Sequence, residues 1–247
     1  MQCFRQRLLA GDLLVSTLIS SPSAEGIELL SKVGFDWLFI DGEHGPFDAL
    51  QMQRMLQAAA SNCPCVIRVP SHDAIAIKKA LDIGAAGIIV PHINNAAQAQ
   101  AAVHAAKYPP RGSRGVGLAR AHEYGISFSD YLETADQKTC VVIQAETRAA
   151  IDNIEEIVAI EDVDAILIGP YDLSANLGHT GEVEHPEVLG AIEKVERACK
   201  QANTKLGYFG VNAQSCTSLY RKRLYPHYRK CRQLIITQCR ATATRRT

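Results

Sequence analysis

The sequence has no excess of charge of either sign. Lys and Arg together number 26, as do Asp and Glu, and no extended acidic run appears. A protein that binds nucleic acid through its phosphates needs a basic surface, so this balance argues against a nucleic-acid partner. We therefore expect the partner to be a small molecule.

Long apolar runs are also missing. No stretch approaches the roughly 18 consecutive apolar residues that a membrane-spanning helix needs. The opening MQCFRQRLLAGD lacks the apolar segment of a secretory signal. We expect a soluble, cytoplasmic protein that does not associate with a membrane.

The eight cysteines show no metal-binding spacing. No CxxC pair typical of a zinc site occurs, and Cys63 and Cys65 flank Pro64 too closely for easy disulfide formation. We expect reduced thiols.

Apolar runs rich in β-branched residues predict seven strands, at 13–19, 37–40, 65–69, 87–90, 140–144, 165–169 and 205–211. Segments with helical spacing of apolar residues lie between them, at 23–34, 48–60, 73–85, 95–108, 147–160 and 185–202. This alternation in a chain of 247 residues favours a single (β/α)8 TIM barrel. A doubly wound open sheet is the alternative, but no GxGxxG follows the first strand. Residues 108–137 interrupt the alternation, and we interpret them as a loop that can cover an active site.

Polar side chains follow several predicted strands at the point where each strand ends. In a barrel of this kind, the carboxyl ends of the strands meet at one mouth, where catalytic groups gather. The strand-end residues are Asp41, Glu43, His44, Arg68, His92, Gln144, Glu146 and Asp172. Any one of them has a structural explanation as a cap or a loop ligand. Their recurrence across five strands predicts a catalytic site.

Glu146 and Asp172 are the pair that we interpret as metal ligands. Two carboxylates with the neutral amide of Gln144 nearby suit Mg²⁺ or Mn²⁺ better than a thiolate or three-histidine zinc site. The alternative is that both carboxylates pair with arginines.

His44 is the residue that we expect to act as a general base, because imidazole side chains titrate close to neutral pH. The alternative is a histidine that only bonds the loop backbone. Arg68 lies inside an apolar strand and is costly to bury without an anion, so a substrate carboxylate or an enolate oxygen would satisfy it. We expect Asp41 and Glu43 to hold the loop and His92 to support the pocket.

Several blocks of sequence resemble one known family. They are FDWLFIDGEHGPFD, VIRVP, ALDIGAAGIIVPHINN, YPPRGSRG, QAETRAAIDNIEEI, DAILIGPYDLSANLG and GYFGVNAQS. In order and spacing they are similar to the HpcH/HpaI family of class II pyruvate aldolases. The resemblance implies a TIM barrel of the phosphoenolpyruvate/pyruvate type, a homo-hexamer, and Mg²⁺ or Mn²⁺ as cofactor, with Co²⁺ as an alternative. The implied reaction is the reversible cleavage of a 4-hydroxy-2-oxo acid to pyruvate, or an analogue, and an aldehyde.

The resemblance also implies roles for individual residues. The base falls on His44, the arginine that stabilises the enolate on Arg68, and the carboxylate that raises the basicity of the histidine on Asp82. The metal ligands fall on Glu146 and Asp172, and the substrate contacts on Gln144, Asp172 and the backbone of Tyr171. Tyr171 departs from the small residue common at that place and is expected to narrow the pocket. Lysine Schiff-base chemistry is the rival mechanism, but no strand-end lysine stands in a suitable place.

The resemblance stops near residue 215. Residues 216–247 are basic and lack a clear amphipathic period, where the family continues with a helix, an eighth strand and terminal helices. Reverse translation of residues 216–236 with permitted codons, shifted by one base, gives VQAFIEKGYTLITVSVDSLLL, which reads as the missing family segment. We therefore divide the chain into a catalytic barrel, 1–215, and an atypical segment, 216–247, that a frameshift explains. The eighth strand and the terminal helices are expected to be missing or aberrant, which puts hexamer assembly in doubt.

Two other functions stay open. One is a related metal-enolate lyase or decarboxylase, acting on oxaloacetate or a citramalyl substrate. The other is a catalytically impaired barrel fragment. His179 and His185 lie in a segment in which no chemical pattern is expected.

Overall fold

The computed structural model describes residues 2–210 and the backbone of residues 234–237. Its strands are all parallel and form a closed barrel in which each strand pairs with the next along the chain. The strands are β1 (Leu14–Ile19), β2 (Trp37–Asp41), β3 (Cys65–Arg68), β4 (Gly87–Val90), β5 (Cys140–Ala145), β6 (Ala165–Ile168), β7 (Lys205–Gly210) and β8 (Leu234–Thr237).

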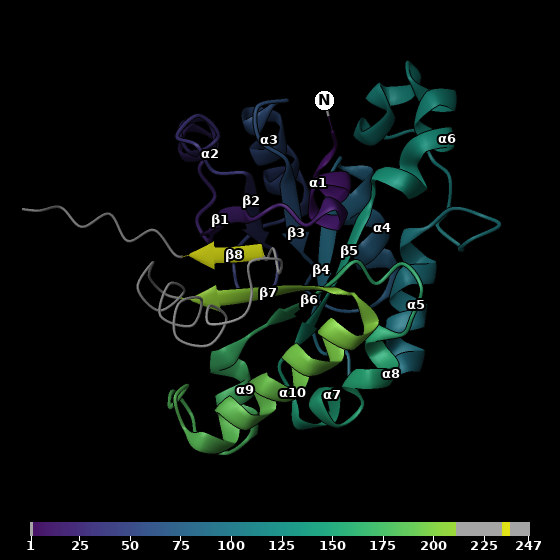
Figure 1. Cartoon of the computed structure of the whole chain (residues 1–247). Coiled ribbons are helices and arrows are strands. Elements are labelled where there is room, and N and C mark those ends of the chain that lie inside the picture. The colour runs from purple at the N-terminus through teal and green to yellow at the C-terminus, as the bar shows by residue number, and fades with distance from the viewer. Residues whose placement is uncertain (1, 211–233, 238–247) are drawn as a thin grey trace, which may run out of the picture.

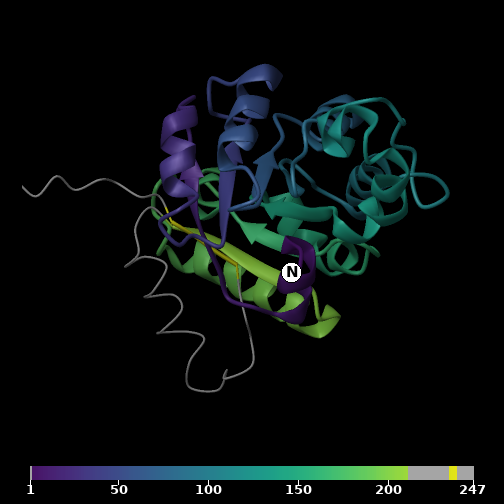
Figure 2. The same ribbon diagram turned by 90° about the horizontal axis from the view of Figure 1, so that it is seen from above.

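The helices lie around the outside of the strands (Figure 1, Figure 2). They are α1 (Phe4–Ala10), α2 (Ala24–Leu30), α3 (Ala49–Ala59), α4 (Ala74–Asp82), α5 (Ala96–Ala106), the 3₁₀ helix η1 (Arg120–Gly125), α6 (Phe128–Lys138), α7 (Arg148–Asp152), α8 (Ile154–Val158), α9 (Pro170–Asn176) and α10 (Pro186–Ala202). No helix in the described part of the chain is long and apolar enough to cross a membrane.

The strands are apolar on both faces because each face meets a different part of the core. Trp37 and Phe39 of β2 belong to the cluster that fills the barrel, and Phe4 of α1 packs on Trp37 with ring centroids 5.4 Å apart. Leu38 and Ile40 belong to the cluster that contacts the surrounding helices. Burial on both faces explains why the strands read as continuous apolar runs.

Most helices that follow a strand begin at a side chain that caps the first turn. Ser23, Asp48, Asp73, Asn95 and Thr147 each accept a hydrogen bond from a backbone N–H of the helix that they precede. Such caps satisfy N–H groups that have no partner within the helix, and each stabilises its helix by about 1 kcal/mol. They fix where the chain turns from strand to helix, and therefore where the strand-end side chains lie.

The interruption at 108–137 differs from the prediction in two ways. Residues 128–138 form α6, where the sequence predicts a loop. The preceding loop also lies at the amino ends of the strands: Arg114 donates to Asp82 at 2.8 Å and Arg120 to the carbonyl of Ile83 at 2.8 Å, both at the end of α4. Within one chain it therefore does not cover the carboxyl-end mouth.

A strand occupies the eighth position of the barrel. The backbone of β8 pairs in parallel with β7 and β1, with Leu234 opposite Gly207 and Leu14. The sequence predicts a missing or aberrant eighth strand, whereas the structure closes the sheet with four residues from the atypical segment. The expected terminal helices and the rest of that segment lie outside the described residues.

Candidate active site

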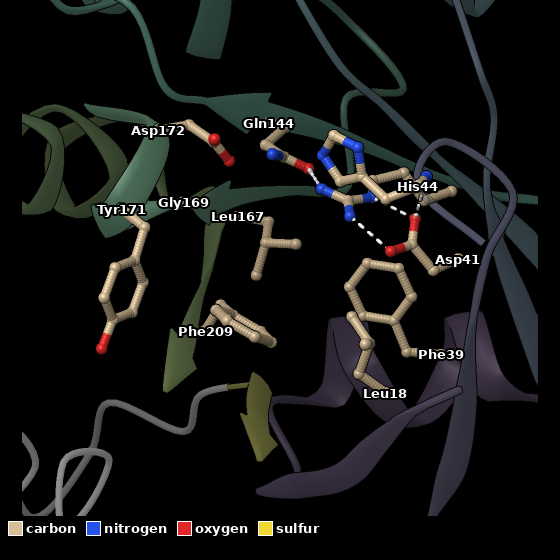
Figure 3. Close-up of a pocket in the computed structure, with 11 residues that line it drawn as sticks. Leu18, Phe39, Asp41, His44, Gln144, Leu167, Gly169, Tyr171, Asp172 and Phe209 are labelled. Carbon is tan, nitrogen blue, oxygen red and sulfur yellow. Dashed lines mark hydrogen bonds and ion pairs between the residues drawn. The ribbon is translucent and has the colours of Figure 1, made fainter. Parts of the chain in front are cut away.

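A cavity of about 290 Å³ opens at the carboxyl ends of the strands. Figure 3 shows polar side chains along one side of it and apolar side chains along the other. The polar side carries Asp41, His44, Arg68, Gln144 and Asp172, and the apolar side carries Leu18, Phe39, Leu167 and Phe209. The convergence of strand ends that the sequence predicts is therefore present.

Arg68 ends β3 and is held almost entirely by carboxylates. Its Nε and Nη2 donate to Asp41 Oδ1 at 2.8 Å and Oδ2 at 2.7 Å, and Nη1 lies 3.1 Å from Glu43 Oε2. Burial alone lowers the pKa of the guanidinium, but the hydrogen bond and charge of Asp41, with the charges of Glu43 and Glu146, raise the pKa above its ordinary value. Arg68 is a fixed cation at the wall of the cavity.

His44 lies in the turn after β2 with its ring 64% exposed at the cavity. Asp41 Oδ1 accepts the backbone N–H groups of Glu43 at 3.2 Å and His44 at 3.3 Å, so Asp41 holds this loop as the sequence predicts. A side chain at Gly45 would collide with the carbonyl of Asp41 and the ring of Phe47, so the tight turn requires glycine there. His44 is thus presented to the cavity by a well-anchored loop.

Glu146, Gln144 and Asp172 meet over the backbone of Gly169. A Cβ atom at Gly169 would lie 3.1 Å from Gln144 Nε2 and 3.6 Å from both Asp172 Oδ2 and Glu146 Cβ. The Gln144 amide also donates to Glu146 Oε2. Among the described residues, neither carboxylate forms an ion pair with an arginine, so the alternative of arginine pairing is not found.

His92 and Glu43 contribute more to the site than the sequence predicts. The backbone N–H of His92 donates to Glu146 Oε1 at 2.8 Å, and its ring lies 3.4 Å from that oxygen and 3.1 Å from Glu43 Oε1. His92 adopts a positive φ of 57°, which points the N–H at Glu146. Glu43, expected to hold the loop, instead contacts Arg68 and His92. The spacing of these residues carries no signal for this arrangement.

The donor set fits a divalent cation. Burial, followed by the charges of Glu43 and Asp172, raises the pKa of Glu146, while hydrogen bonding and charge from His92 oppose that rise. Glu43 Oε2 is buried and lies 3.1 Å from Arg68 Nη1 in an ion pair, but it accepts no hydrogen bond from the described residues. The carboxylates of Asp41, Glu43 and Glu146 surround the single guanidinium of Arg68 and leave an excess of negative charge. Carboxylate oxygen atoms are the hard ligands that Mg²⁺ and Mn²⁺ prefer.

Asp82 lies away from the place that the resemblance implies, whereas Tyr171 lies at the cavity. Asp82 ends α4 at the amino-end side of the barrel and accepts from Arg114 at 2.8 Å, so it is not a partner of His44 within one chain. The physical reason is that the Arg114 side chain is fully buried and needs a carboxylate. Tyr171 lines the cavity, but its ring points away from Asp172 (Figure 3).

Known proteins resemble this chain in both sequence and structure. The sequence is 41% identical over 214 residues to a 4-hydroxy-2-oxo-heptane-1,7-dioate aldolase from Klebsiella pneumoniae, covering 85% of this chain and 80% of that protein. It is 41% identical over 203 residues to a 4-hydroxy-2-oxovalerate aldolase from Rhodococcus jostii, covering 80% and 78%. A crystal structure of an HpcH/HpaI aldolase/citrate lyase family protein from Burkholderia cenocepacia superimposes with a TM-score of 0.87 at 33% identity, covering 95% and 91%.

A family-level comparison agrees with these individual matches. Residues 18–222 match the sequence model of the HpcH/HpaI aldolase/citrate lyase family. That span contains the described strands β2 to β7 and all the side chains that line the cavity. The chain belongs to the HpcH/HpaI aldolase/citrate lyase family.

Proposed function

We propose that this protein is a divalent-metal-dependent aldolase that reversibly cleaves a 4-hydroxy-2-oxo acid to pyruvate, or a close analogue, and an aldehyde. The observation that carries the proposal is the convergence of a histidine, a buried arginine, an amide and two carboxylates on one cavity at the barrel mouth. The relatives named as aldolases for 4-hydroxy-2-oxo acids support the reaction class.

The chemistry follows from where charge and protons must go. Cleavage of the C3–C4 bond removes the proton of the C4 hydroxyl and leaves negative charge on the enolate of the 2-oxo acid. His44 is the base that accepts the hydroxyl proton, since its exposed ring faces the cavity. Arg68, held in place by Asp41, supplies a fixed positive charge for the oxyanion. A divalent cation held by Glu146 and Asp172 would supply Lewis acidity at the substrate carbonyl.

The substrate itself is oriented by neutral and charged groups of the same wall. The amide of Gln144 lies between Arg68 and Glu146, where it can meet the carboxylate end of a 2-oxo acid. The backbone of Tyr171 and the side chain of Asp172 border the same opening. The apolar side of the cavity leaves the aldehyde half of the substrate away from this charged end.

Pyruvate release measures the proposed reaction directly. The chain is incubated with 4-hydroxy-2-oxo acids and Mg²⁺ or Mn²⁺, with and without a chelator, and compared with His44→Ala. His72→Ala is the matched control, because this exposed histidine lies in a loop away from the cavity lining. Activity is expected to need the metal and His44 but not His72. Turnover that survives both the chelator and His44→Ala would contradict the proposal.

Product analysis separates the neighbouring reactions of such a site. Carbon dioxide from oxaloacetate, in the absence of aldol cleavage, would indicate a decarboxylase. Release of a thioester from a citramalyl substrate would indicate a lyase of the citrate-lyase type. Pyruvate together with a free aldehyde is the result expected here.

We further propose that copies of the chain assemble into a hexamer. Four side chains of the loop at the amino ends of the strands support an interface, because Val116, Leu118, Tyr124 and Ile126 are 53–87% exposed. Asp82 anchors this loop through Arg114 and lies at the opposite end of the barrel from His44. If Asp82 assists His44, the contact forms between copies. Light scattering on the eluted protein gives the assembly mass, and a monomer would contradict this proposal.

We also propose that a frameshift produced residues 216–247, which gives a second candidate function, a catalytically impaired barrel. The shifted text VQAFIEKGYTLITVSVDSLLL and the end of the family match at residue 222 support the division near residue 215. Sequencing the gene around the codon for Cys216 tests it, and stop codons throughout the alternate frame would reject it. Size-exclusion chromatography and turnover are then compared with a frame-restored chain. Equal folding and activity of both would reject the impaired-barrel function.

A further inference from the structure

We propose that His179, Glu182 and His185 form a second metal site, separate from the barrel mouth, that takes a transition-metal dication such as Zn²⁺. One ligand atom from each residue lies within 4.8 Å of the others. The three residues belong to the loop that joins α9 to α10, below the barrel in Figure 1. None of them lines the cavity at the strand ends.

The backbone of this loop brings the three side chains together. The N–H of Glu182 donates to the carbonyl of His179 at 2.9 Å, and the N–H of His185 donates to the carbonyl of Glu182 at 2.9 Å. Two successive turns of this kind repeat every three residues, so side chains spaced by three lie on one side of the loop. The loop is also tied to α9, because His179 N and Gly181 N donate to the carbonyl and the hydroxyl of Ser174. The backbone therefore holds the three residues close together before any metal binds.

The side chains are arranged so that nitrogen lone pairs remain for a metal. His179 Nε2 faces Glu187 Oε2 at 3.0 Å, and Arg148 holds the other oxygen of Glu187 at 2.6 Å. A carboxylate that accepts from one ring nitrogen leaves the other nitrogen as the ligand atom, as is common around zinc-bound histidines. His179 therefore offers Nδ1.

The second imidazole lies directly against the first. The rings of His179 and His185 are stacked with centroids 3.4 Å apart. The lone pair of a ring nitrogen lies in the plane of its ring, so two stacked rings cannot bind one cation, and metal binding requires the His185 ring to turn out of the stack. Coordination by His185 Nδ1 would replace the long 3.3 Å hydrogen bond that this atom accepts from Glu187 N.

The ligand types select a different metal from the one expected at the barrel mouth. Two imidazoles and one carboxylate suit Zn²⁺ and its neighbours, whereas Glu146 and Asp172 offer only oxygen. Bound there, the cation would cross-link the turns that follow α9, the helix that carries Asp172. The proposed role is structural, and none of the three ligands lines the cavity at the barrel mouth.

Zinc stoichiometry tests the proposal on the full chain. The parent is dialysed against Zn²⁺ alone and compared with His179→Gln/His185→Asn, in which asparagine keeps a good N-cap for α10. The matched control is His72→Ala/His104→Ala, which removes two exposed histidines elsewhere. The parent and the control are expected to bind one more equivalent of Zn²⁺ than the loop variant. Equal zinc content in the parent and the loop variant would overturn the proposal.

Three further measurements keep this test independent of folding and of the aldolase site. Zn²⁺ is expected to raise the unfolding temperature of the parent more than that of the loop variant. Glu187→Gln is expected to weaken zinc binding by about 10–100-fold, because it replaces the charged acceptor of His179 Nε2 with a neutral amide. Glu146→Gln/Asp172→Asn is expected to abolish aldol cleavage and to retain the loop-bound Zn²⁺. Loss of that zinc in this last variant would assign the metal to the barrel mouth and refute the loop site.

Discussion

The pairing of Asp41 with Arg68 gives the sharpest prediction, because both side chains are buried and their geometry is bidentate. Asp41 is 3% exposed and Arg68 is 7% exposed. Their two hydrogen bonds measure 2.7 and 2.8 Å. Asp41→Ala would leave the guanidinium buried with the Glu43 carboxylate at 3.1 Å and the Gln144 amide oxygen at 3.4 Å.

The magnitude follows from what is lost and what remains. Removing one partner of a buried ion pair costs about 3–5 kcal/mol. The acceptor for Glu43 N and His44 N is lost as well, at about 1 kcal/mol for each hydrogen bond. Glu43 and the open cavity offset part of this cost, so Asp41→Ala is expected to lower the free energy of unfolding by about 4 kcal/mol. Asp41→Asn keeps an oxygen for the loop and is expected to cost about 2 kcal/mol.

Urea unfolding followed by circular dichroism, at one fixed protein concentration, measures both values. A double-mutant cycle with Arg68→Met isolates the pair. In the Arg68→Met background, Asp41→Ala is expected to cost only the two loop hydrogen bonds, about 2 kcal/mol. If Asp41→Ala costs under about 1 kcal/mol, or the same amount in both backgrounds, the guanidinium does not depend on Asp41 and the reasoning is wrong.

Two substitutions test the metal site, and one alkylation measurement tests the core. Gly169→Ala places a methyl group 3.1 Å from Gln144 Nε2, so calorimetry is expected to show Mn²⁺ binding weakened by about tenfold. Unchanged Mn²⁺ affinity would mean that Gln144, Glu146 and Asp172 do not bind a shared ligand. His92→Asn keeps a residue that tolerates the positive φ but loses the ring contacts to Glu43 and Glu146. A similar weakening of Mn²⁺ binding is expected. Unchanged Mn²⁺ binding would mean that the His92 ring is dispensable. Burial raises the pKa of the Cys63 thiol to about 11 from 9.0, so alkylation in the folded chain, followed by mass spectrometry, is expected to be slow at pH 8. Because the unfolded chain loses that proton first, stability is expected to fall as the pH rises from about 9 to about 11, and rapid alkylation at pH 8 would contradict this.

The strands could be predicted from the sequence because burial on both faces leaves a simple signal. The predicted run at 87–90 coincides with β4, and the run at 37–40 differs from β2 by one residue. The helix α6 was predicted as a loop, and that prediction was wrong. Its residues Phe128, Tyr131, Leu132 and Ala135 do keep a helical spacing, although only Ala135 is buried.

The broken helix at 147–160 has a different cause. Ile151, Ile154 and Ile157 keep a helical spacing across the break, so the sequence predicts one continuous helix. In the structure the side chain of Asn153 donates to the carbonyl of Asn94 at 2.8 Å, and two short helices meet at this residue. A contact with a residue 59 positions away leaves no trace in the local pattern.

The site was predictable as far as the strand ends determine it. His44, Arg68, Gln144 and Asp172 follow or end four different strands, and the topology of a parallel barrel brings such positions to one mouth. The part played by His92 depends on a positive φ, which the sequence PHIN does not specify. Strand-end position therefore predicts which residues gather, while backbone conformation decides which atoms face one another.

Within one chain, Asp82 and His44 lie at opposite ends of the barrel. It ends a helix that leads into β4, so it lies at the amino ends of the strands, whereas His44 follows the carboxyl end of β2. The buried guanidinium of Arg114, stacked 4.7 Å over the ring of Tyr108, already needs the carboxylate of Asp82 for its charge. An interaction of Asp82 with His44 consequently requires a second copy whose loop at the amino ends of the strands reaches the barrel mouth. The exposed Ile126 lies in the same segment, so under the proposed assembly the contact between copies and the implied effect of Asp82 on His44 would depend on one surface.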